Sequence, residues 1–188
     1  MRKLTITLLA TFAIAASTLS NAAEYVVDVK GAHAFINFKA SHLGYSWLTG
    51  RFNKFDGSFT YDDKNPSASK ITVNIDPASI DSNHAERDKH LRSDDFLSVD
   101  KFPESKFVST KIVDKGDKKL EVVGNFTLHG VTRSIVIDAV KVGEGKDPWN
   151  GYRAGFTGTT TINVADYDFK NAWVGNIELE LHIEGIRQ

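Results

Sequence analysis

Short runs of alternating apolar and polar residues fill the chain from residue 25 onward, and this period of two is typical of half-buried strands. The last run is the clearest: Ile177, Leu179, Leu181 and Ile183 share one face, with glutamate and histidine residues between them. One wet and one buried face is typical of antiparallel sheets, because parallel sheets are usually covered on both sides. The pattern therefore predicts an all-β protein.

Nine segments carry this pattern and are expected to be strands. They span residues 25–29, 34–40, 51–61, 70–76, 106–114, 120–129, 132–142, 152–164 and 177–185. Turn-forming sequences separate several of them, for example Gly143–Gly151 with its single proline. Strands at this spacing are typical of a barrel or a sandwich, and the alternation alone does not distinguish the two.

The segment 81–103 breaks the period of two. Asn83 followed three residues later by Glu86 predicts a helix start of the capping-box type. Glu86 and His90 then fall at i,i+4 spacing on one helix face. We therefore expect a short charged helix over about residues 84–92, inserted between strands as a lid or plug.

Residues 1–22 have the features of a signal peptide. Two basic residues precede an apolar run at 4–16, and small residues follow where a signal peptidase would cut. We expect cleavage after Ala22, with Ala23 as the alternative, and hence export to the periplasm. An uncleaved membrane anchor is the less favoured interpretation, because a spanning helix needs about 20 apolar residues.

The mature part, residues 23–188, is long enough for one domain with a sizeable core. It carries 21 basic and 24 acidic residues, a net charge of −3, and the charges are mixed along the chain. Nucleic acid is excluded as a partner because its binding needs concentrated Lys and Arg. The chain has no cysteine, which excludes disulfides and a lipoprotein anchor.

A series of short motifs runs through the mature chain. They are SHLGYSW at 41–47, FDG at 55–57, SNHAERDKHLRS at 82–93, GNFTLHGVT at 124–132 and RAGF at 153–156. Together they closely resemble the signature of the YceI-like family of bacterial periplasmic proteins. The resemblance implies an extended, lipocalin-like antiparallel β-barrel of about eight strands, whose apolar pocket holds a long-chain polyisoprenoid or quinone-like lipid. One segment departs from the family: residues 163–169 read NVADYDF, without the Arg and Gly that many members carry.

The resemblance implies a lipid-binding or carrier protein, linked to envelope stress or quinone traffic, and a homodimer would allow two barrels to share a long lipid. The alternative is an enzyme or chaperone-like factor that acts on an isoprenoid lipid in the same pocket. A third interpretation is a fully packed barrel without a ligand. We expect no metal, cofactor or catalytic residues, because the sequence has no HExxH, no GxSxG and no phosphate-binding loop.

A polyprenyl chain needs a deep apolar tube with a few polar groups at one end. The candidates for the wall are six phenylalanines, which could equally fill an ordinary β-core: Phe38, Phe52, Phe55, Phe59, Phe126 and Phe156. The segment 41–50 contains His42, Leu43 and Trp47 between two strand runs, and it is expected to form either the mouth of the barrel or a packed corner. Tryptophan suits a mouth because one side of its ring system is apolar and the other can be wet.

Several cations could receive an anionic head group: Arg87, His90, Arg92 and Arg153. Those on the expected helix more simply form a solvated face held by weak ion pairs. Arg153 lies between two glycines at the start of a strand, and arginine offers a planar fork of donors to phosphate. Arg153 is therefore the preferred head-group candidate.

Overall fold

The computed structural model describes residues 22–188, so the expected signal peptide lies outside the described residues except for Ala22. The strands are β1 (Ala23–Val27), β2 (Phe35–His42), β3 (Ser46–Phe52), β4 (Phe55–Tyr61), β5 (Lys70–Ile75), β6 (Ile80–Asp81), β7 (Ser105–Gly116), β8 (Lys119–Leu128), β9 (Val131–Lys146), β10 (Tyr152–Asn163) and β11 (Asn176–Arg187). The helix α1 spans Ala85–Arg92, and the 3₁₀ helices are η1 (Pro66–Ala68), η2 (Pro77–Ser79), η3 (Val164–Tyr167) and η4 (Ala172–Val174). Within residues 22–188, no helix is long and apolar enough to cross a membrane.

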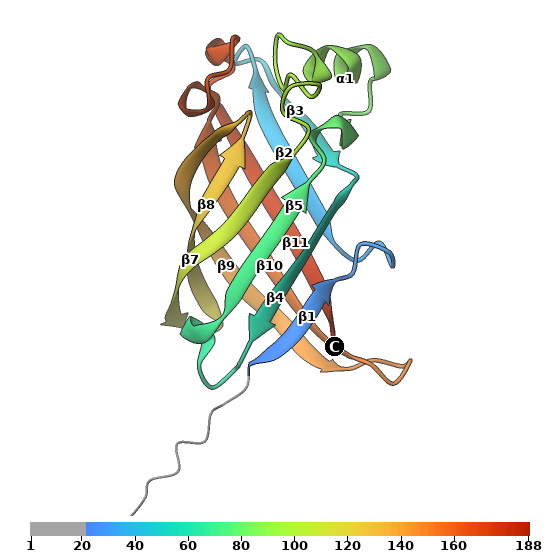
Figure 1. The fold of residues 1–188 in the computed structure, drawn as a ribbon, viewed down its shortest axis with the longest axis vertical. Helices are drawn as coiled ribbons and strands as arrows, with labels where there is room; N and C mark the ends of the chain where they lie inside the picture. Colours follow the sequence, from blue (N-terminus) through green and yellow to red (C-terminus); the bar gives the residue numbers. More distant parts are fainter. Residues whose placement is uncertain (1–21) are drawn as a thin grey trace, which may run out of the picture.

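Eight strands close into an antiparallel barrel in the order β1-β4-β5-β7-β8-β9-β10-β11, and pairing of β1 with β11 completes the ring (Figure 1). β2 pairs with the first half of β11, and β3 and β6 extend the sheet beyond it. The predicted lipocalin-like barrel of about eight strands is therefore confirmed, and the sandwich is excluded. A barrel of eight strands has an interior that side chains fill or that holds one small ligand.

The prediction of a single strand over residues 51–61 is wrong, because β3 ends at Phe52 and β4 begins at Phe55. Between them, the backbone N–H groups of Asn53 and Lys54 donate to the carbonyl and hydroxyl oxygens of Ser79, at 3.1 and 2.9 Å. The chain therefore bends sharply and passes from one strand pairing to another. The segment 41–50, expected between strands, instead completes the β2–β3 hairpin.

β9 and β10 diverge toward one end of the barrel, where their last paired residues are Asp138 and Thr159. The 3₁₀ helix η3 fills the resulting split with Tyr167, which is buried and packs edge-on against Phe126. Burial, together with the nearby Asp166, raises the pKa of the Tyr167 phenol to about 12. Side-chain packing rather than backbone pairing thus seals this part of the wall.

The predicted helix forms within one residue of its expected bounds, but its cap differs. His84, not Asn83, occupies the N-cap, where its Nδ1 accepts from the Arg87 N–H at 3.2 Å. Asn83 instead adopts a left-handed conformation with φ of 62°. Figure 1 shows α1 at the end of the barrel opposite the C-terminus, as expected for a lid.

Candidate functional site: the barrel cavity

An elongated cavity of about 550 Å³ runs inside the barrel. This volume lies within the range of about 300–1,000 Å³ that is typical of pockets for one small ligand. Its wall is almost wholly aliphatic and aromatic, and all eight strands of the ring contribute to it. β1 contributes Val27, and β11 contributes Ile177, Leu179, Leu181 and Ile183. The alternating residues of the last strand therefore face the cavity, as the sequence pattern predicts.

Aromatic rings close the end of the cavity nearest the C-terminus. The rings of Tyr25 and Phe59 stack at 4.9 Å, and Phe156 meets Phe59 and Tyr61 edge-on at 5.5 and 5.1 Å. Phe59 lies flat against β11 because Gly185 has no side chain, and a Cβ there would come within 2.5 Å of the ring. A ligand that enters the barrel must stop at this aromatic cluster.

A buried lysine supports the closed end beyond the rings. Lys141 points inward from β9, with its Nζ 4.9 Å from the centre of the Tyr61 ring. It also contacts Asp63 and lies 3.5 Å from Glu144. Burial alone would lower the pKa of Lys141, but the Asp63 hydrogen bond and the neighbouring Tyr61 and Glu144 raise it above its usual value. The charged amine of Lys141 thus remains paired with carboxylates at the outer edge of the aromatic cluster.

The opposite end of the cavity is open. Three segments line it there: His42 from β2, Trp173 from η4, and His90 and Phe96 from α1 and the loop that follows. Trp173 and His90 line the cavity and are also exposed, whereas Tyr61 at the other end is buried. The cavity is therefore a tube with one mouth, at the end that carries α1.

Hydrogen bonds hold α1 at this mouth. The buried Asp88 carboxylate accepts from the Ser82 backbone N–H at 2.8 Å and from its hydroxyl at 2.5 Å. Arg87 donates from Nε to the Ser82 hydroxyl at 2.7 Å, and Arg92 donates to the backbone carbonyl oxygen of Ile80 at 3.3 Å. The charges of α1 therefore mainly fasten the helix to the barrel, and Arg87 and His90 also face the cavity.

Six of the ten residues predicted for the ligand site line this cavity. They are Phe38, His42, Phe52, Phe59, Phe126 and Phe156. Phe55 packs against the hydrophobic core without lining the cavity. Leu43 and Trp47 lie in the hairpin next to the mouth, but they face solvent rather than the cavity.

Arg153 lies outside the cavity, in an ionic cluster on the outer face of the barrel near its closed end. Its Nη1 lies 2.6 Å from an oxygen of Asp28 and 2.5 Å from an oxygen of Glu184, and its Nε lies 2.8 Å from Asp147. The hydrogen bonds from Arg153 and His33 lower the pKa of Asp28 to about 2. Arg153 is therefore already committed to three carboxylates, which leaves it poorly placed to receive the head group of a ligand inside the barrel.

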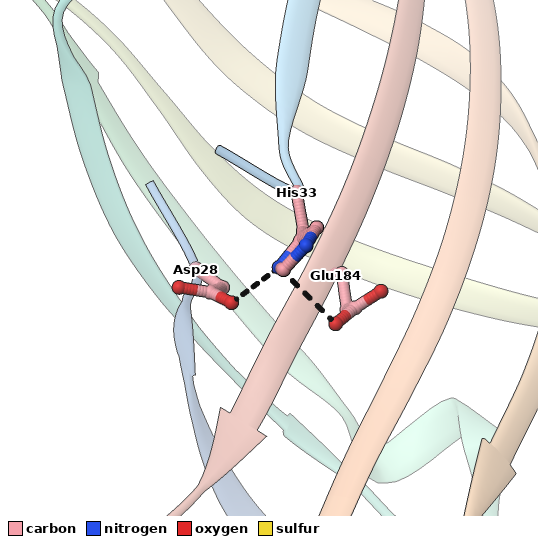
Figure 2. A group of neighbouring side chains, drawn as sticks. All are labelled: Asp28, His33 and Glu184. Carbon is pink, nitrogen blue, oxygen red and sulfur yellow. Dashed lines mark hydrogen bonds and ion pairs between the residues drawn. The ribbon is translucent and has the colours of Figure 1, made fainter. Parts of the chain in front are cut away.

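His33 completes this cluster and raises the question of a metal. Figure 2 shows its ring between Asp28 and Glu184, with Nδ1 at 2.9 and 3.9 Å from their nearest oxygens. The three ligand atoms lie within 4.8 Å of one another, a separation that would allow one cation. However, Arg153 contacts the same two carboxylate oxygens, so its guanidinium already supplies the positive charge there. A bound ion would have to displace it.

Some wall residues were not named as site residues from the sequence. Aliphatic examples are Ile112, Leu120, Val122 and Ile137, and their inward direction follows from the same alternation as in the last strand. Trp173 carried no usable signal, because it lies in a non-periodic loop between β10 and β11. A larger hollow of about 1350 Å³ lies over β2, β3 and β9–β11, but polar residues such as the ion pair Lys39–Glu178 line it, so it does not suit a hydrocarbon.

A closed antiparallel barrel with one apolar, single-mouthed cavity defines the class of lipocalin-like proteins. Within that class, the YceI-like domain matches residues 25–185, and the chain belongs to this family. It is 56% identical over 172 residues to a UPF0312 protein of Shewanella sp. (strain ANA-3), covering 90% of both chains.

Solved structures agree with this assignment. The Campylobacter jejuni YceI protein is 28% identical and superimposes with a TM-score of 0.71, covering 79% of this chain and 90% of that one. A polyisoprenoid binding domain from Saccharophagus degradans, 14% identical, has the same fold with a TM-score of 0.64, covering 89% and 99% of the two chains.

Proposed function

We propose that this protein is a periplasmic carrier that holds one long-chain polyisoprenoid or isoprenoid quinone in the barrel cavity and releases it unchanged. The observation that carries this proposal is the cavity itself, which is apolar along its length and open at one end. Burial of a hydrocarbon there gains roughly 25 cal/mol for each Å² removed from water, less the loss of freedom of the ligand.

The distribution of polar groups supports the same ligand class. His42, Arg87 and His90 gather at the mouth, where the head group of an inserted lipid would remain. At the closed end, the rings of Phe59, Tyr61 and Phe156 would contact the far end of the hydrocarbon tail. The related domain from Saccharophagus degradans, described as polyisoprenoid-binding, adds support through its shared fold.

The test is native mass spectrometry, with organic extraction, of the full chain expressed in a Gram-negative host and purified. We expect one long-chain isoprenoid per protein and, if the leader is cleaved, the intact mass of residues 23–188 in the periplasmic fraction. A protein that is purified empty and also fails to take up added polyprenyl phosphate or ubiquinone would require the proposal to be abandoned.

The same lipid preparation separates a carrier from an enzyme. After incubation with the protein, a carrier returns the added lipid with its mass unchanged. Conversion of the lipid, with a loss of turnover in His42→Ala or His90→Ala, would instead identify an enzyme that uses the groups at the mouth. A His182→Ala variant is the matched control, because His182 lies in β11 and does not line the cavity.

A further inference from the structure

Four large apolar side chains surround the mouth of the cavity and face solvent. Leu43, Tyr45 and Trp47 of the β2–β3 hairpin are 62%, 86% and 57% exposed, and Trp173 of η4 is 67% exposed. We call these four residues the rim. Single exposed apolar residues are common on proteins, but a cluster of them at one edge marks an interaction surface.

Strand pairing brings the two parts of the rim together. β11 follows directly after η4, and its residue Ile177 pairs with Ala40 of β2. The chain that precedes β11 therefore lies beside the chain that follows Ala40, which forms the hairpin. Figure 1 shows the hairpin and the loop before β11 at the same end of the barrel, opposite the C-terminus.

The rim continues into the cavity without a polar break at Trp173. This side chain lines the cavity and is also mostly exposed, so one apolar surface passes from the inside of the barrel to the outside. A long-chain lipid could follow this surface without being exposed to water, which would otherwise cost about 0.8 kcal/mol for each CH₂ group.

The charges next to the rim have partners within the protein. Lys39 lies 2.6 Å from Glu178 and also 4.4 Å from the centre of the Trp47 ring. Lys170, three residues before Trp173, contacts Asp95. The rim thus presents apolar and aromatic surface with little unpaired charge, which suits the interface of a lipid bilayer better than an acidic or nucleic-acid surface.

We infer that the rim docks on a lipid bilayer, with its tyrosine and tryptophans at the level of the head groups and the mouth of the cavity toward the acyl chains. This inference rests on the proposed function, because the bilayer is the reservoir from which an isoprenoid lipid would enter the cavity. Docking is driven by burial of the rim rather than by charge. It therefore needs no anionic lipid and persists at high salt.

Co-sedimentation with phosphatidylcholine vesicles tests the inference. The variants are the double substitution Tyr45→Ser/Trp173→Ser and the control Trp149→Ser, which removes an equally exposed tryptophan from the β9–β10 turn at the other end of the barrel. Wild type and control should bind equally in low salt and in 1 M NaCl, and the double variant should bind about tenfold less. Equal binding by all three proteins would overturn the inference.

Fluorescence quenching locates the rim relative to the membrane with substitutions by phenylalanine, which keep the rim apolar. Of the three tryptophans, Trp173 remains alone in Trp47→Phe/Trp149→Phe, and Trp149 remains alone in Trp47→Phe/Trp173→Phe. Brominated lipids should quench Trp173 and leave Trp149 unquenched. This readout needs no folded double serine variant, and quenching of Trp149 alone would contradict the proposed orientation.

The outcomes separate docking from lipid carriage. A protein that carries an isoprenoid but does not bind vesicles would overturn the docking inference and leave the proposed function intact. Rim-dependent vesicle binding by a protein that never holds lipid would support docking and refute the carrier. A dimer in sedimentation velocity that is lost in Tyr45→Ser/Trp173→Ser, without vesicle binding, would identify a second copy as the occupant of the rim and overturn the inference.

Discussion

The guanidinium of Arg153 lies 2.6 Å from the carboxylate of Asp28, a residue 125 positions earlier in the chain. Asp28 directly follows β1, and Arg153 belongs to β10, so this contact spans the seam at which β1 pairs with β11 to close the barrel. The same nitrogen also contacts Glu184 of β11. One side chain therefore ties together three neighbouring strands at the point of ring closure.

Replacement of Arg153 by leucine should destabilise the barrel without emptying its cavity. Asp28 is 5% exposed, and loss of Arg153 leaves its carboxylate with only the hydrogen bonds from His33 and the Gly31 N–H. The cost should therefore be somewhat below the about 3–5 kcal/mol that is typical of a fully unpaired buried charge. Urea unfolding should show this loss, and native mass spectrometry of the folded fraction should show unchanged lipid occupancy. Arg187→Leu, which removes an exposed arginine from the end of β11, should have little effect. Lost lipid occupancy at unchanged stability would instead support a role of Arg153 in binding the head group.

The same contact predicts how stability depends on pH. The pKa of Asp28 is lowered to about 2 from its usual 3.8, so the folded state favours the charged form. Such a group contributes stability that is fully present above about pH 4 and is lost as the pH falls toward 2. The advantage of the wild type over Asp28→Asn in unfolding free energy should therefore shrink by on the order of 2 kcal/mol between pH 5 and pH 2. A constant difference across this range would rule out Asp28 as the titrating group.

A bulkier residue in the wall should shorten the lipid that the cavity accepts. Ala139 in β9 faces the cavity, where it pairs with Gly158 of β10, and Val140 beside it faces outward and is exposed. Ala139→Phe should therefore shift the extracted lipids toward shorter chains or lower their occupancy, as measured by mass spectrometry. Val140→Phe adds a ring of the same size outside the barrel and should leave the lipids unchanged. Identical lipids in both variants would mean that the ligand lies elsewhere.

The period of two predicts most of the fold because it is a local property. The inward residues of β11 follow from sequence spacing alone, and the break in that spacing predicts α1 within one residue of its bounds, although not its N-cap. The bend between β3 and β4 was missed, although Phe52 and Phe55 lie an odd number of positions apart. A single strand could not direct both of these rings inward, and the bend does so: Phe52 lines the cavity and Phe55 packs on the core.

The ligand site was less predictable, since it depends on contacts between distant residues. From the sequence Arg153 is a candidate free cation, because two of its three carboxylate partners, Asp28 and Glu184, lie 125 and 31 positions away. Leu43 lies in the turn of the β2–β3 hairpin with a φ of 54°, a backbone conformation that the alternation does not encode. The phenylalanines within regular strands were easier to place, as their direction follows from their neighbours.

Loss of the Asp88 contact should loosen α1 and speed the release of lipid. The buried Asp88 carboxylate accepts two hydrogen bonds from Ser82, so Asp88→Ala leaves the buried Ser82 N–H and hydroxyl without this acceptor. An unsatisfied buried donor costs about 1–3 kcal/mol. Since α1 lies at the mouth and outside the ring of strands, most of this cost should appear as local opening of the helix rather than as unfolding of the barrel.

Hydrogen exchange resolves this effect by position. In Asp88→Ala, amides of residues 85–92 should exchange faster while those of β8 and β11 keep their protection, and bound lipid should transfer to acceptor vesicles more quickly. Glu86→Ala is the matched control, because Glu86 is exposed on the same helix. Faster exchange in α1 without faster lipid release would show that the helix is not the barrier at the mouth, and the rate of exit would then depend on the rim or on the cavity wall.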